Sequence, residues 1–156
     1  MMIDKHQGGC LCGRLRFSTE GEPERASVCH CRTCQLRTGS AFSVSVYFRI
    51  VKVSVLSGAL LSYTRESESG HRWDIRRCEN CGTALFWTIS GYDWDGLIGV
   101  AGGCFDPPAF WYSLTREVFT RSRAPFCTIE VPHHLETHPA HAPRHPDPPR
   151  LDGSGA

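Results

Sequence analysis

Long hydrophobic runs are missing from this sequence of 156 residues. No stretch approaches the roughly 18 consecutive apolar residues that a transmembrane helix needs, so no membrane span is expected. The first six residues, Met1–His6, lack the apolar segment of a secretory signal, and we therefore expect a cytoplasmic protein. A large basic excess is missing too, because the formal net charge is +1, and this argues against nucleic acid as a partner.

The sequence does contain enough apolar residues for one domain, and it has a C-terminal tail of different character. Hydrophobic residues make up 40% of the chain, so a packed core is feasible. Every cysteine falls before residue 132, and we assign residues 1–131 to the folded domain. Residues 132–156 hold five of the eight histidines and six of the ten prolines. Few apolar residues accompany them, so this tail is predicted to be disordered or loosely packed, with at most weak metal binding.

Alternation of apolar and polar residues with a period of two dominates the domain and predicts an all-β fold. Long amphipathic helices are absent, and only Cys31–Gly39 is predicted to form one or two helical turns. Glycine and proline separate the alternating segments, as expected of turns. The predicted strands are Arg14–Ser18, Phe42–Phe48, Val51–Val55, Leu61–Thr64, His71–Ile75, Ala84–Ile89, Leu97–Ala101 and Arg116–Arg121.

Nine cysteines, an odd number in a chain expected to remain reduced, favour metal binding over disulfides. Four of them form two pairs, and each pair is followed by a glycine, Gly13 or Gly82. Two such pairs supply the four thiolates of a closed, structural zinc site; the alternative is four buried apolar thiols. We name these residues the four-cysteine group: Cys10, Cys12, Cys78 and Cys81.

Cys29, Cys31 and Cys34 form a second cluster, the three-cysteine group. Three protein ligands and one open position are what a catalytic zinc needs, so these residues are the predicted catalytic ligands. Three thiolates make zinc a poor activator of water, but a further thiol bound there becomes a reactive thiolate. The alternative is a second structural site, completed by one of three other residues: His30, Cys104 or Cys127.

Three motifs in this order resemble the glutathione-dependent formaldehyde-activating enzyme family, which includes centromere protein V. They are Gly8–Gly13, Cys29–Cys34 and Cys78–Leu85, and the similarity continues through 102–107 and 119–125. The resemblance implies small twisted sheets around two Zn²⁺ ions, a structural one in the four-cysteine group and a catalytic-type one in the three-cysteine group. It also implies a carbon–sulfur lyase that adds glutathione, or a similar small thiol, to a small aldehyde such as formaldehyde.

Glutathione carries two carboxylates, so its binding site should offer cations. Arg32 and Arg37 flank the three-cysteine group and are the predicted glutathione-binding residues, although solvated arginines would look the same. Arg121 and Arg123 alternate on a predicted strand and are expected to face one side. Arg77 stands where many relatives carry an aromatic residue. The rival to an enzyme is a noncatalytic zinc module that binds a thiol, a protein or a nucleic acid.

Overall fold

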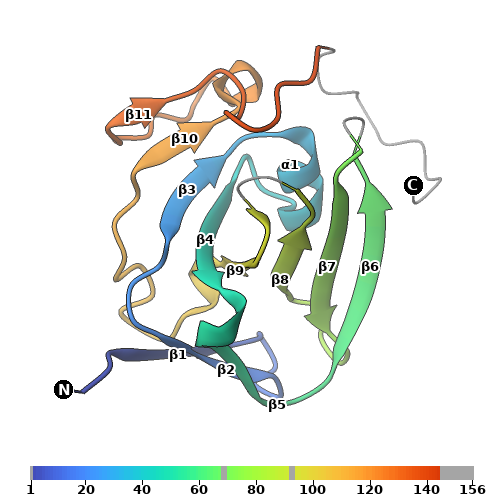
Figure 1. Cartoon of the computed structure of the whole chain (residues 1–156), viewed down its shortest axis with the longest axis vertical. Coiled ribbons are helices and arrows are strands. Elements are labelled where there is room, and N and C mark those ends of the chain that lie inside the picture. The colour runs from blue at the N-terminus through green and yellow to red at the C-terminus, as the bar shows by residue number, and fades with distance from the viewer. Residues whose placement is uncertain (1, 68–69, 92–93, 145–156) are drawn as a thin grey trace.

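Two β-sheets make up most of the computed structural model, which describes residues 2–67, 70–91 and 94–144 (Figure 1). The smaller sheet has the strand order β1 (Lys5–Gly9), β2 (Arg16–Glu20) and β5 (Val53–Ser57). The larger sheet has the order β11 (His133–His134), β10 (Arg116–Val118), β3 (Arg25–Cys29), β4 (Ser43–Arg49), β9 (Leu97–Ala101), β8 (Ala84–Ile89), β7 (Arg72–Cys78) and β6 (Leu60–Glu66). The predicted all-β fold is confirmed.

Helical structure is short in the part of the chain that the structure describes. The α-helix α1 (Arg32–Thr38) follows Cys31 and ends at Gly39, whose φ of 65° is the left-handed conformation that glycine adopts without strain. Three 3-10 turns complete the described helices: η1 (Ile50–Lys52), η3 (Gly102–Cys104) and η4 (Thr120–Ser122). None of these helices has the length and apolar character needed to cross a bilayer.

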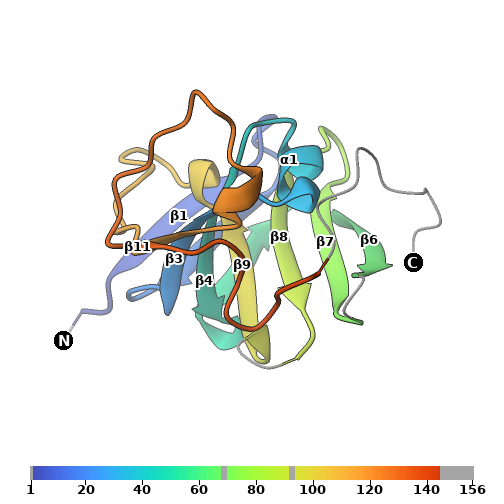
Figure 2. The same cartoon turned by 90° about the horizontal axis from the view of Figure 1, so that it is seen from above.

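Most neighbouring strands pair antiparallel, but β10 runs parallel to both β3 and β11. This pairing places Val118 opposite Cys29, although the two residues are far apart in the sequence. The end of β3, where the three-cysteine group begins, therefore lies beside the C-terminal third of the chain. Figure 2 shows β11 at the edge of the larger sheet, on the β3 side.

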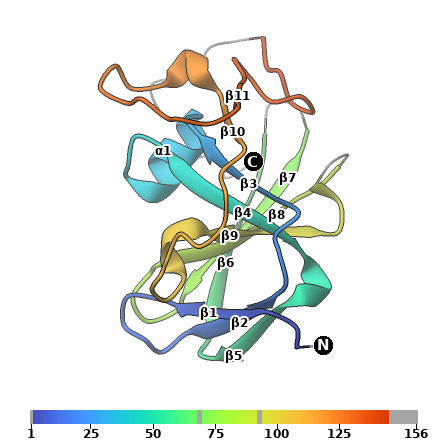
Figure 3. The same ribbon diagram turned by 90° about the vertical axis from the view of Figure 1, so that its left-hand side faces the viewer.

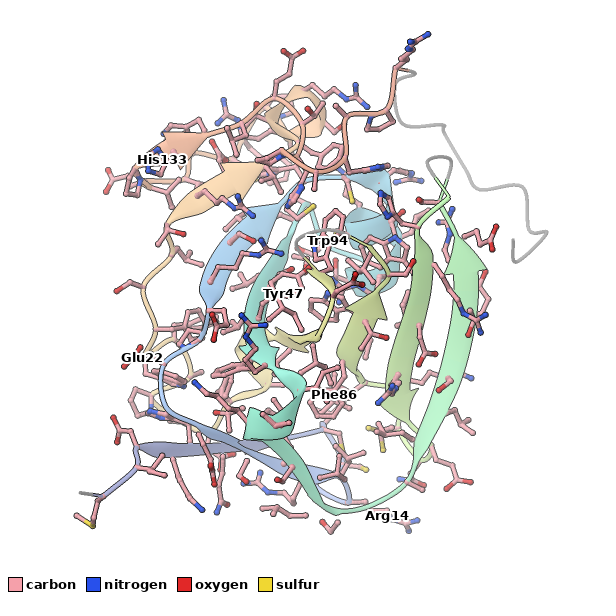
Figure 4. All side chains as sticks on the ribbon, viewed as in Figure 1. Arg14, Glu22, Tyr47, Phe86, Trp94 and His133 are labelled. Atoms are coloured by element: carbon pink, nitrogen blue, oxygen red, sulfur yellow. The ribbon has the colours of Figure 1, made fainter. Side chains whose placement is uncertain are left out.

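The central strand β4 is buried on both faces and separates two core regions. Val46 and Phe48 belong to the core that also contains Phe17 of the small sheet, whereas Tyr47 packs with Trp94 in a second cluster. In Figure 4, Tyr47 and Trp94 lie toward the α1 end and Phe86 toward the small sheet. Figure 3 shows the small sheet and α1 at opposite ends of the molecule.

The period-two signal located eight of the described strands but missed β1, β3 and β11. The segment of β1, Lys5–Gly9, has no alternation, and it is ordered by pairing with β2. The predicted strand Arg116–Arg121 is wrong beyond Val118, because Phe119 adopts φ 58° and the chain turns into η4. Arg121 therefore lies in a 3-10 turn, and its expected alternation with Arg123 on a strand is wrong.

The first part of the tail differs from the predicted disordered or loosely packed segment. Strand β11 pairs with β10, and the His138 ring, 7% exposed, stacks on Trp94 with ring centroids 4.6 Å apart. The His138 ring thus contributes to the packing of this segment, together with Leu135 and Ala140. The remainder of the predicted tail, residues 145–156, lies outside the described residues.

Candidate metal centres

The four-cysteine group is assembled from two turns that are distant in sequence. One turn joins β1 to β2 and carries Cys10 and Cys12; the other joins β7 to β8 and carries Cys78 and Cys81. The four sulfurs lie within 4.8 Å of one another, and none is in a disulfide. The Sγ atoms of Cys10 and Cys12 are 3.4 Å apart, and those of Cys12 and Cys78 are 3.9 Å apart.

These sulfur separations fit tetrahedral zinc. Zn–S bonds of about 2.3 Å place neighbouring sulfurs about 3.8 Å apart. The two turns also have the same form: Cys10 N–H donates to the Leu15 carbonyl at 3.1 Å, and Cys78 N–H donates to the Thr83 carbonyl at 2.9 Å. Gly13 allows the left-handed bend in the first turn, with φ 78°. The group could therefore hold a metal ion without rearrangement of the backbone.

Hydrogen bonds from the turns favour the thiolate form that a metal requires. The Leu15 N–H donates to Cys10 Sγ at 3.3 Å. Hydrogen bonds from the Thr83 side chain and backbone, with the Cys12 backbone, lower the pKa of Cys81 to about 5. Donors aimed at sulfur stabilise negative charge there, which lowers the cost of gathering several thiolates.

The three-cysteine group is built at the junction of β3 and α1. Cys29 ends β3, Cys31 is the N-cap of α1, and Cys34 lies in the first turn of the helix. Their sulfurs lie within 4.8 Å of one another, and the Cys34 N–H donates to Cys31 Sγ at 3.4 Å. Cys31 and Cys34 are buried. Among the described residues, no fourth cysteine, histidine or carboxylate completes this group.

The close thiols of the three-cysteine group favour the binding of a cation, because they cannot all carry negative charge without one. Hydrogen bonds from Cys29 and Cys31 hold the pKa of Cys34 well below its usual value, and Arg37, whose Nη2 is 3.7 Å from Cys34 Sγ, acts in the same direction. The pKa of Cys29 lies well above its usual value, because of its contacts with Cys31 and Cys34 and its burial. Three buried thiols that cannot all ionise together are the donor set that a soft metal ion neutralises.

A buried polar network supports the ligand loop from behind. His30, fully buried between Cys29 and Cys31, shares a hydrogen bond of 2.7 Å between its Nε2 and Glu117 Oε2. The other carboxylate oxygen of Glu117 is 2.6 Å from both His134 Nδ1 and Arg123 Nη1. The Nε2 atom of His30 is therefore engaged with Glu117.

A cavity of about 90 Å³ adjoins the three-cysteine group. All three cysteines line it, together with aromatic residues and short hydroxyl side chains. Its walls also include Phe119, in the left-handed conformation that bulky residues rarely adopt and that recurs at functional sites. Histidines from two separate segments contribute too: His71, His138 and His141.

The other predicted site residues are used in different ways. Arg37 lies 3.8 Å from the centre of the Trp87 ring and donates to Ser43 Oγ at 2.6 Å. Arg32 donates to Gln35 Oε1 at 3.4 Å. Their role in glutathione binding stays a prediction. Neither Cys104 nor Cys127 belongs to a described cluster, and burial raises the pKa of Cys104 to about 11.

Fold and site together define a small all-β domain that gathers seven of its nine cysteines into two candidate metal centres. The model of the glutathione-dependent formaldehyde-activating enzyme family matches residues 5–122. The chain belongs to this family.

Two known proteins are similar over part of the chain. An uncharacterized lyase of Schizosaccharomyces pombe is 27% identical over 88 residues, 56% of this chain and 61% of that protein. The match thus spans about three fifths of the length of that relative. A Rhodobacter sphaeroides protein of known crystal structure is 19% identical, with a TM-score of 0.49, covering 69% of this chain and 96% of that one. The family and the lyase relative support a thiol-related, lyase-type role.

Proposed function

We propose that the chain is a zinc-dependent carbon–sulfur lyase that joins a small thiol, such as glutathione, to a small aldehyde, such as formaldehyde. The observation that carries the proposal is that the three-cysteine group offers three sulfurs beside a cavity, with no fourth ligand among the described residues. In the reaction, the thiol sulfur forms a bond to the carbonyl carbon while the carbonyl π bond breaks. The proton lost from sulfur is balanced by the one that the oxygen gains, and the product is a hydroxymethyl thioether.

Cys29, Cys31 and Cys34 would hold the zinc at the wall of the cavity. Zinc held by these residues would lower the pKa of a substrate thiol and favour its nucleophilic thiolate form. The protein's part is to fix three ligands and to exclude bulk water, and the burial of Cys31 and Cys34 supports this. The four-cysteine group, with all four positions filled, would hold a second, structural zinc.

His71 is one of the histidines that line the cavity. Its Nδ1 is 2.8 Å from the Ser90 carbonyl oxygen, and a carbonyl only accepts, so Nδ1 carries the hydrogen. Sequence reasoning missed this residue, because a single histidine on an alternating strand carries no motif.

NMR exchange between glutathione, formaldehyde and their adduct tests the proposed function. The exchange also proceeds without catalyst, so zinc-loaded wild type is compared with Cys34→Ser at equal concentration. Cys127→Ser is the matched control, because Cys127 lies outside both groups. Faster exchange with wild type and Cys127→Ser, and the background rate with Cys34→Ser, is the expected result. Background rates with all three proteins would overturn the assignment and leave a noncatalytic thiol-binding module.

A further inference from the structure

Beside the three-cysteine cavity lies a second hollow, of about 290 Å³, between α1 and the face of strands β6 and β7. Figure 1 shows α1 beside the upper ends of β7 and β8. Thr33 lines both spaces, so they meet at this residue. The walls include Leu36, Tyr63 and Ile75, and three arginines: Arg37, Arg65 and Arg77. We name this hollow the arginine groove.

The described residues that line the arginine groove carry charge of one sign. They include three arginines but no aspartate or glutamate. Arg37 is engaged with Trp87 and Ser43, as described above. Arg65 donates to Thr33 Oγ1 at 3.3 Å, and in the part of the chain that the structure describes neither Arg65 nor Arg77 pairs with a carboxylate. On a chain of net charge +1, this groove is a local concentration of positive charge.

Strand register fixes the spacing of Arg65 and Arg77. Arg65 is paired with Trp73, and Arg77 with Leu61, in the antiparallel β6–β7 ladder. The two arginines therefore share one face of the sheet and lie four residues apart along the strands, about 13 Å at 3.3 Å per residue. The long, flexible side chains can bridge part of this span.

The three-cysteine cavity is too small and too uncharged to bind the whole of a charged thiol such as glutathione. Among the described residues, no arginine, lysine or carboxylate lines it, and its volume of about 90 Å³ is below the roughly 300 Å³ at which pockets begin to enclose whole ligands. Glutathione has a thiol on its middle residue and a carboxylate at each end. A substrate of this form needs a buried place for sulfur and two cationic places outside it.

We infer that the arginine groove binds the carboxylates of the thiol substrate, with Arg65 and Arg77 as its two cationic ends, while the sulfur reaches past Thr33 into the three-cysteine cavity. This inference rests on the proposed function and identifies its thiol as one with a carboxylate at each end. Arg65, held to Thr33, marks the boundary between groove and cavity. Guanidinium groups suit this task, because their paired N–H donors match a carboxylate.

Binding measurements on the zinc-loaded full chain test the inference. The variants are Arg65→Gln, Arg77→Gln and the double variant, with Arg72→Gln as the matched control. Arg72 lies on the same strand and carries the same charge, but strand alternation places it on the opposite face from Arg77 and Ile75. The probes are glutathione, S-methylglutathione, which keeps both carboxylates but has no free thiol, and uncharged 2-mercaptoethanol.

Each single variant should weaken binding of glutathione and S-methylglutathione about tenfold, and the double variant about a hundredfold, as expected for hydrogen bonds to charged groups. The Kd of 2-mercaptoethanol should stay within about twofold, because it lacks carboxylates. Unchanged Kd values for S-methylglutathione in the double variant would overturn the inference, as would equal losses for all three probes or for Arg72→Gln. S-methylglutathione reports on the groove alone, so failure of the lyase activity is seen separately in the exchange experiment.

Discussion

The four-cysteine and three-cysteine groups use the same ligand chemistry in different surroundings. The first lies on two surface turns, and its Cys12 is exposed. Backbone N–H groups and Thr83 point at its sulfurs, and all four positions of a tetrahedron are filled. The second lies at a helix N-terminus against a buried histidine–glutamate contact, with two of its cysteines buried and a cavity at its side.

Under the proposed function, this difference separates a centre that stabilises the fold from one that is available for chemistry. A filled ligand set between two distant turns gains its free energy from closing the chain, and nothing further needs to reach the metal. An unfilled set is useful only where neighbouring residues hold it in place and shape the space beside it. The His30–Glu117 contact and the lining of the cavity provide both in the three-cysteine group.

The largest expected effect comes from breaking the filled set with Cys78→Ser. A closed zinc site contributes on the order of 10 kcal/mol to folding, which is as large as the whole stability of a domain. We therefore expect this variant to lose the dispersed amide spectrum of a folded protein and most of its bound zinc. Two-dimensional NMR and metal analysis by mass spectrometry measure both, with Cys127→Ser as the control. A folded Cys78→Ser protein with two zinc ions would contradict the assigned role.

Cys34→Ser should separate the two centres. We expect it to lose one equivalent of zinc and the thiol–aldehyde exchange but to remain folded, because the four-cysteine group still joins the two turns. Zinc content, near-ultraviolet circular dichroism and exchange rate are compared in the same preparation. Global unfolding of Cys34→Ser would show that both centres are structural, and the distinction drawn above would not hold.

Glu117→Gln should test the support of the three-cysteine group. Glu117 is fully buried, and its carboxylate contacts the buried His30 and the more exposed His134 and Arg123, so removing its charge weakens the hydrogen bonds that it accepts. The loss of a hydrogen bond to a charged group costs about 1.5–3 kcal/mol, and we expect a loss of that size. Urea unfolding at pH 7 measures this loss. The exposed Glu130→Gln is the matched control, with the same change in charge and little expected loss. A loss below about 1 kcal/mol would rule out the supporting role.

The contribution of Glu117 to stability depends on pH through the pKa of its carboxyl group. Burial acts to raise this pKa, but hydrogen bonds from His134 and His30 and the charge of Arg123 outweigh it, so the folded-state pKa lies below the ordinary value. A lowered folded-state pKa means that stabilisation is present above the unfolded pKa of about 4.3 and is lost as pH falls through the folded value. The difference in stability between wild type and Glu117→Gln should therefore be constant from pH 7 to about 5 and shrink only in stronger acid.

The sequence was most informative where a feature is local. Period-two alternation predicted most strands, paired cysteines with a following glycine indicated the four-cysteine group, and the close spacing of Cys29, Cys31 and Cys34 indicated the three-cysteine group. Turn-forming Gly39 also predicted where the helix ends. These signals lie within a few residues of one another, so no knowledge of the pairing of distant strands is needed.

What the sequence could not predict depends on distant pairing. Strand β1 has no pattern of its own, and the His30–Glu117 contact exists because β10 lies parallel to β3. The cavity needs Phe119, His71 and His138, which three separate segments bring together. The arginine groove could not be predicted from the sequence either, since Arg65 and Arg77 share a face only through the β6–β7 register.

Asp106→Asn has the smallest expected effect, and it compares an exposed ion pair beside the small sheet with the buried contacts of the three-cysteine group. Asp106 pairs with Arg16 of the small sheet, and both side chains are partly exposed. The hydrogen bond from Arg16 is the main reason that the pKa of Asp106 is lowered, so the pair stabilises the protein above the unfolded pKa of about 3.9 and is lost as pH falls through the folded value. Exposed pairs contribute about 1 kcal/mol or less and are screened by salt. We expect urea unfolding at pH 7 to show a loss of that size in the free energy of unfolding. The loss should be smaller in about 0.5 M salt than in about 0.05 M salt. A loss as large as that of Glu117→Gln, or one indifferent to salt, would mean that polar contacts matter equally on both sides of the molecule, and that burial alone does not distinguish the three-cysteine group.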